Sequence, residues 1–126
     1  KEKIMATCNC GSDTKTLLYA CSGAANTGLL SDRVTRQLAS AGTGSMTCLA
    51  AVGAGLENFV KSAGCAQRNV VIDGCPVACG KKVMDNIGAR YDHLVMTEFG
   101  VEKCKTAITD QVVADVFEKV AAALQR

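Results

Sequence analysis

The chain has 126 residues, a formal net charge of +2, eight cysteines, and no aromatic residues beyond two tyrosines and three phenylalanines. Its basic residues are scattered among acidic ones rather than gathered in a stripe, which argues against nucleic acid as a partner. No apolar run reaches the roughly 18 residues that a transmembrane helix needs, so no membrane partner is expected.

The eight cysteines indicate either a disulfide framework or thiols with a chemical task. Disulfide frameworks are typical of small secreted domains that lack a proper core. Here strand and helix patterns alternate, and residues 1–11 lack the apolar core of a signal peptide. We therefore expect a cytoplasmic protein whose thiols bind a metal or carry out redox chemistry.

The predicted elements alternate between strand and helix along the chain. Continuous apolar runs predict four strands, at residues 16–21, 45–50, 69–73 and 93–97. Helical spacing of apolar residues predicts four helices, from Asn26 or Thr27 to Gly42, from Leu56 to Gly64, from Pro76 to about Ile87, and from Thr109 or Asp110 to Leu124.

This alternation predicts the fold class, because buried strands separated by helices form a parallel sheet with both faces covered. We expect an α/β fold: a three-layer α/β/α sandwich around a mainly parallel four-stranded sheet, Rossmann-like. Residues 15–126 are expected to form one domain. Residues 1–14 are expected to form a polar N-terminal segment that carries Cys8 and Cys10.

The junction from Asp73 to Pro76 ends the third predicted strand and begins the third predicted helix. Because proline suits the first helical position, Cys75 is expected at the helix N-terminus, one turn before Cys79. A helix dipole and free backbone N–H groups stabilise a thiolate there. Asp73 is expected to cap the turn by accepting backbone N–H bonds or to orient a metal ligand.

Four cysteines are expected to meet at one edge of the sheet. Cys21 ends the first predicted strand, Cys48 lies late in the second, and Cys75 and Cys79 follow the third. Ligands of open α/β sheets bind outside the carboxyl ends of the strands. Thiolates are common zinc ligands, and the Cβ atoms of residues four positions apart on a helix are about 5–6 Å from each other. Zinc at these four cysteines is the leading prediction.

Other cysteines and the single histidine leave alternatives open. Cys48 taken alone could equally be a small buried apolar side chain. Cys8 and Cys10 could ligate the same metal as a flap, or form a second site with Cys104. For His93, a surface or loop role is expected rather than a ligand role.

Rival functions use the same cysteines, and the sequence leaves open whether the protein is an enzyme. One is a thiol redox or sulfur-carrier enzyme with Cys75 as a readily deprotonated nucleophile. Another places an iron–sulfur cluster on the four cysteines instead of zinc. Tyrosine phosphatase chemistry is disfavoured. Those enzymes have a C-x5-R loop, and in a loop that began at Cys21 the position of the arginine is occupied by Thr27.

Five short segments carry a family resemblance: residues 20–25, 48–53, 71–76 with the central Asp73-Gly74-Cys75, 79–82 and 100–103. They resemble the DGC-domain family, small bacterial and archaeal proteins described as zinc-binding. The resemblance covers nearly the whole chain in the right order, and it implies Cys21, Cys48, Cys75 and Cys79 as the metal ligands. It implies a site but no reaction, because the family's function is unknown.

Overall fold

Four parallel strands form the centre of the fold, in the order β2-β1-β3-β4. The computed structural model describes residues 16–125, so the predicted segment 1–14 with Cys8 and Cys10 lies outside the described residues. The predicted α/β class and parallel sheet are confirmed. The strands are β1 (Thr16–Ala20), β2 (Ser45–Met46), β3 (Arg68–Asp73) and β4 (Asp92–Val95).

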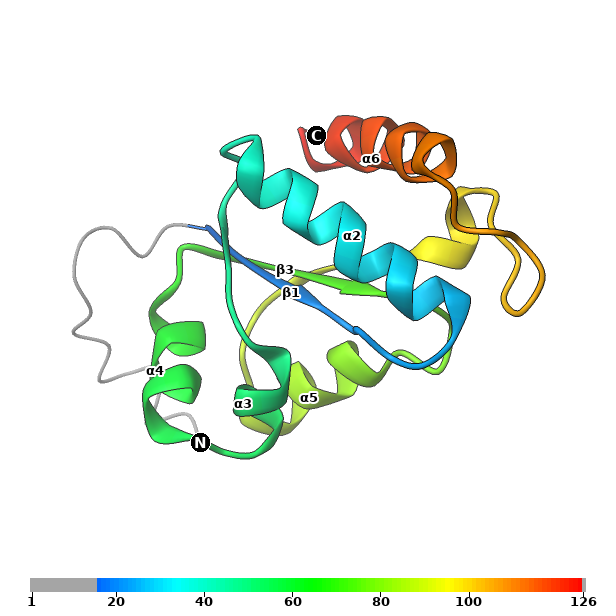
Figure 1. Ribbon diagram of the computed structural model, residues 1–126. Helices are drawn as coiled ribbons and strands as arrows, with labels where there is room; N and C mark the ends of the chain where they lie inside the picture. Colours follow the sequence, from blue (N-terminus) through cyan, green and yellow to red (C-terminus); the bar gives the residue numbers. More distant parts are fainter. Residues whose placement is uncertain (1–15, 126) are drawn as a thin grey trace.

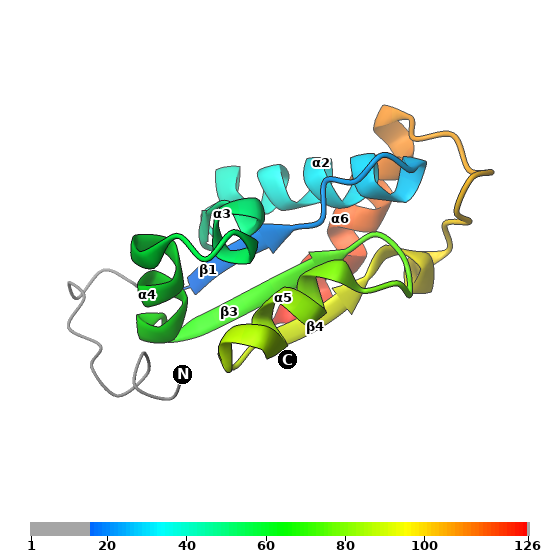
Figure 2. The same ribbon diagram turned by 90° about the horizontal axis from the view of Figure 1, so that it is seen from below.

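Helices cover both faces of this sheet, as Figures 1 and 2 show. On one face lie α2 (Asn26–Ser40) and α6 (Asp110–Leu124). On the other lie α3 (Leu49–Gly53), α4 (Glu57–Cys65) and α5 (Cys79–Ile87). The 3-10 helix η1 (Met96–Phe99) follows β4. The predicted three-layer sandwich is therefore confirmed.

The two central strands supply both halves of the core. Along β3, Val70 and Ile72 pack with α2 and α6, whereas Val71 packs with α3, α4 and α5. Next to Val71 in the sheet, the buried Tyr19 hydroxyl donates a hydrogen bond to Asn69 Oδ1 over 2.8 Å. Burial raises the pKa of Tyr19 well above its usual range. Strands buried on both faces explain why β1 and β3 were predictable from apolar runs.

The second predicted strand, residues 45–50, is wrong in its second half. The strand ends at Met46, and the apolar residues from Leu49 onwards form helix α3. A short apolar run fits a buried strand and a buried helix equally well, so the pattern could not distinguish them. The connection from β2 to β3 therefore contains two helices. Leu56, where the second predicted helix begins, is the N-cap residue of α4 and is 51% exposed.

The helix boundaries agree with the predictions in part. Thr109 caps α6 as predicted, its Oγ1 accepting a hydrogen bond from the Val112 N–H group. Helix α5 ends before Gly88, which has a φ of 72°. In α2 the predicted Asn26 or Thr27 cap is wrong, because the helix begins after Ala25 and has no side-chain cap.

The Asn26 side chain instead holds the loop of residues 100–109. Its amide Nδ2 donates to the Glu102 and Thr106 carbonyl oxygens over 3.1 and 2.8 Å, and its Oδ1 accepts from the Cys104 N–H group over 2.7 Å. This loop is thereby fastened to the first residue of α2, across more than seventy residues of sequence.

Candidate thiol site

Three connections meet at the carboxyl edge of the sheet, and together they build the site. They are residues 21–25 after β1, residues 74–78 after β3, and residues 100–109 before α6. Figures 1 and 2 both place these connections at the same end of the molecule. The meeting of β1 and β3 follows from their parallel pairing, in which Ala20 lies opposite Ile72.

A cavity of about 180 Å³ between these connections, hereafter the thiol pocket, is lined by three of the predicted ligands. Cys21, Cys75 and Cys79 all contribute to its wall. Each is a free cysteine; Cys21 and Cys75 are half-buried, and Cys79 is exposed. The structure thus brings together thiols from two different strand ends, as the sequence predicts.

The predicted start of the third helix is wrong, which changes the surroundings of two thiols. Residues 76–78 form a turn in which the Ala78 N–H group donates to the Cys75 carbonyl oxygen over 3.0 Å. Ala78 adopts a left-handed conformation with φ 57° and ψ 51°, and α5 begins at Cys79. The thiol at the helix N-terminus is therefore that of Cys79, whereas Cys75 lies in the preceding turn.

Asp73 accepts backbone N–H bonds, as predicted, but from the first turn of helix α5 rather than from the turn that directly follows β3. Its carboxylate is buried, with Oδ1 accepting from the Gly80 N–H group over 2.8 Å and Oδ2 from the Lys81 N–H group over 3.1 Å. The His93 Nε2 atom lies 2.7 Å from Oδ2. A carboxylate at a helix N-terminus is stabilised both by these donors and by the helix dipole.

The Cys21 thiol is half-buried at the end of β1. Burial raises its pKa, and electrostatic interactions with Asp73 and Cys79 act in the same direction. Hydrogen bonds from the Gly23 and Gly74 backbone N–H groups lower it and offset part of the effect. The net result favours the protonated thiol of Cys21.

Cys75 has a cation beside it. The Lys103 Nζ atom lies 3.3 Å from the Cys75 Sγ atom, and Lys103 comes from the loop that Asn26 fastens to α2. This contact places a positive charge directly beside the sulfur of Cys75. Lys103 was not identified from the sequence, because no local pattern links positions 28 residues apart.

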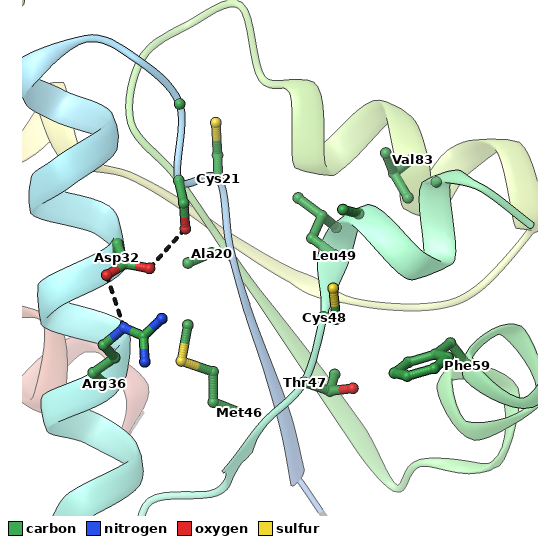
Figure 3. Close-up of a pocket in the computed structure, with 14 residues that line it drawn as sticks. Ala20, Cys21, Asp32, Arg36, Met46, Thr47, Cys48, Leu49, Phe59 and Val83 are labelled. Carbon is green, nitrogen blue, oxygen red and sulfur yellow. Dashed lines mark hydrogen bonds and ion pairs between the residues drawn. The ribbon is translucent and has the colours of Figure 1, made fainter. Parts of the chain in front are cut away.

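Cys48, the fourth predicted ligand, does not line the thiol pocket. It is the exposed residue before α3, and it lines a separate cavity of about 870 Å³, which Figure 3 shows. Cys21 also contributes to this cavity, so the two cavities adjoin at Cys21. At its rim, burial alone would raise the pKa of Asp32, but hydrogen bonds from Arg36 and Ser22 lower it.

Within residues 16–125, no three His, Cys, Asp or Glu side chains are arranged so that they could hold a metal ion. The donor chemistry of the thiol pocket fits zinc, since thiolates are preferred ligands of that ion. The side-chain positions do not form a ready-made centre. The predicted ligands Cys8 and Cys10 lie outside the described residues.

His93 was expected to have a surface or loop role, and its contact with Asp73 was missed. In the parallel pairing of β3 with β4, Val71 lies opposite His93 and Asp73 opposite Val95. Alternate residues of a strand share a face, so the His93 and Asp73 side chains project from the same side of the sheet. The contact between His93 and Asp73 could therefore have been predicted only if the register of β3 with β4 had been known.

These features define a small α/β protein with a thiol pocket at the carboxyl edge of its sheet. The family model described as the DGC domain matches residues 17–120, and the chain belongs to this family. It is 32% identical over 96 residues to the Anaerobic and virulence modulator AnvM of Pseudomonas aeruginosa, covering 72% of this chain and 70% of that protein. No solved structure matches the chain.

The sequence prediction of DGC-family membership is thus confirmed. None of the helices within residues 16–125 combines the length and apolarity needed to cross a membrane.

Proposed function

We propose that this protein binds zinc through the thiolates of Cys21, Cys75 and Cys79, with Cys48 as the fourth ligand. The observation that carries the proposal is that three of these four cysteines line one small pocket. Binding requires their side chains to turn toward a common point, because residues 16–125 hold no preformed centre. Cys8 and Cys10 are the alternative donors for the fourth position.

A shell made of thiolates alone leaves no open coordination position, so zinc bound here would supply structural or metal-handling chemistry rather than hydrolysis. The protein's own contribution is to hold the thiols near loops that side-chain hydrogen bonds fix in place. Asp73 fixes the start of α5, where Cys79 lies, and Asn26 fixes the loop that carries Lys103. The Lys103 ammonium group would offset part of the negative charge of the thiolates.

The cytoplasm is the proposed compartment, because thiolate ligands persist where thiols are kept reduced. The name of the Pseudomonas aeruginosa relative links that protein to anaerobic conditions and virulence. Thiolates are oxidised readily when exposed to oxidants. We propose by analogy that the thiols of this chain also serve under conditions where little oxygen is present.

Metal analysis tests the proposal. Protein purified anaerobically without a metal-chelating tag should contain about one zinc ion per chain, measured by elemental analysis. Cys75→Ser and Cys79→Ser should each lose most of this zinc, whereas Cys104→Ser, an exposed cysteine outside the thiol pocket, should retain it. Iron together with visible absorbance would indicate a cluster instead. Wild-type protein that is folded and metal-free would refute the proposal.

A thiol redox or sulfur-carrier activity is the second candidate, and the contact of Lys103 with Cys75 favours it. A thiolate held by a cation reacts faster with electrophiles than a buried thiol does. In chelator-treated protein at roughly neutral pH, iodoacetamide should modify Cys75 about tenfold faster than Cys21, or more.

Lys103→Met should remove most of that difference in rate, whereas Lys105→Met, on the same loop, should leave it unchanged. Peptide mass spectrometry over time gives the rate at each cysteine. Equal rates at Cys75 and Cys21 in the wild-type protein would exclude a nucleophilic role for Cys75.

A further inference from the structure

The N-terminus of α2 faces the thiol pocket without a counter-charge of its own. The helix has 15 residues, no side-chain cap and no acidic residue in its first turn. Ala25, Thr27 and Gly28 all line the pocket. The first backbone N–H groups of a helix and its dipole together attract negative charge. A helix N-terminus alone does not make a site, so further observations are needed.

The second observation is the Thr27 side chain. It is 1% exposed, and its Oγ1 is a buried polar atom that has no hydrogen-bond partner within the described residues. Buried hydroxyl groups nearly always have a partner, and one without it suggests an unseen ligand. Thr27 lines the thiol pocket, so a ligand in the pocket could supply the missing partner.

The third observation is the charge around the pocket. Lys103 lines it and brings an ammonium group to within 3.3 Å of the Cys75 Sγ atom. The Asp73 carboxylate also lines it, but its oxygens are occupied by the Gly80 and Lys81 N–H groups and by His93. The sequence disfavours tyrosine phosphatase chemistry because Thr27 stands where those enzymes have an arginine. The structure supplies a cation from a distant loop instead.

We propose that the thiol pocket binds a small tetrahedral oxyanion of phosphorus or sulfur. The N-terminus of α2, the Thr27 hydroxyl group and the Lys103 ammonium group hold the oxyanion. A cavity of about 180 Å³ is large enough for such an ion and too small for most metabolites that carry one. The proposal goes beyond zinc binding and does not depend on it, since none of these groups is a proposed metal ligand.

Isothermal titration calorimetry of the full chain tests this, with inorganic phosphate and with sulfate in separate titrations. At least one of the two ions should bind, and the comparison shows which one the pocket prefers. Thr27→Val, which keeps the side-chain shape, and Lys103→Met should each weaken binding about tenfold. Lys105→Met, on the same loop but exposed, should bind within about twofold of wild type.

A titration in the presence of a metal chelator separates this proposal from zinc binding. Unchanged binding supports the oxyanion site even where elemental analysis finds no zinc, whereas loss of binding with the chelator would overturn it. Absence of binding in the wild-type protein, or wild-type affinity in both Thr27→Val and Lys103→Met, would also overturn it. Because Lys103 is exposed, Lys103→Met is expected to fold even if Thr27→Val does not.

Discussion

Asp73→Ala should lower the free energy of unfolding by about 3–5 kcal/mol, because it removes the shared acceptor of a buried hydrogen-bond network. The Asp73 carboxylate is 1% exposed, accepts two backbone hydrogen bonds at the start of α5, and lies 2.7 Å from His93 Nε2. Alanine would leave all three groups without their acceptor. Urea denaturation followed by circular dichroism measures the loss.

Asp85→Ala is the matched control. Asp85 is an exposed carboxylate in α5, the helix whose start Asp73 holds, and it is paired with Lys81 and Tyr91 at the surface. Its removal should leave the urea midpoint close to that of wild type, since exposed ion pairs contribute little. The Asp73→Asn variant should fall between the two. If Asp73→Ala were no less stable than Asp85→Ala, the capping role of Asp73 would be wrong.

Gly74→Ala should destabilise the protein by about 1–3 kcal/mol and deform the thiol pocket, because the glycine touches the backbone of α2. A Cβ atom at position 74 would lie 2.7 Å from both the carbonyl carbon and the oxygen of Thr27, and 2.9 Å from the Gly28 nitrogen. Backbone atoms cannot move aside as a flexible side chain can, so the two segments would have to separate. Chemical denaturation of the purified variant gives the change in stability.

Gly53→Ala provides the comparison for this variant. A Cβ atom at position 53 would meet only Val83 Cγ2, at 3.5 Å, which is an ordinary contact. Position 53 lies in α3, and alanine favours a helix more than glycine does, so this variant should be at least as stable as wild type. Equal stability of the two variants would show that Gly74 does not need its small size.

The layers of the fold could be predicted because the central strands are apolar on both faces and the long helices have one apolar face. Residues 69–73 were predicted as a strand and lie in β3. The last predicted helix exists as α6, and its apolar residues from Val113 to Leu124 pack on the sheet. The edge strand β2 was harder to predict, because its few residues run into an apolar segment that folds as a helix.

The thiol site could be predicted only in outline. The parallel order of the strands was enough to bring Cys21 and Cys75 to the same edge. The left-handed conformation of Ala78 could not be predicted, because alanine has no preference for that conformation, and it moves the helix start to Cys79. The contacts of Lys103 and Asn26 join distant segments, and such contacts follow from tertiary packing rather than from a local pattern.

The short outer strands bear on aggregation. The central segment of β3, residues 70–72, is apolar, β-branched and uncharged, a composition typical of segments that form intermolecular sheets when exposed. In the folded chain it is paired on both sides, by β1 and by β4. Within residues 16–125, the outer strands are only two and four residues long, so each offers a neighbouring molecule little unpaired backbone. The folded protein thus protects this segment from pairing with neighbouring molecules.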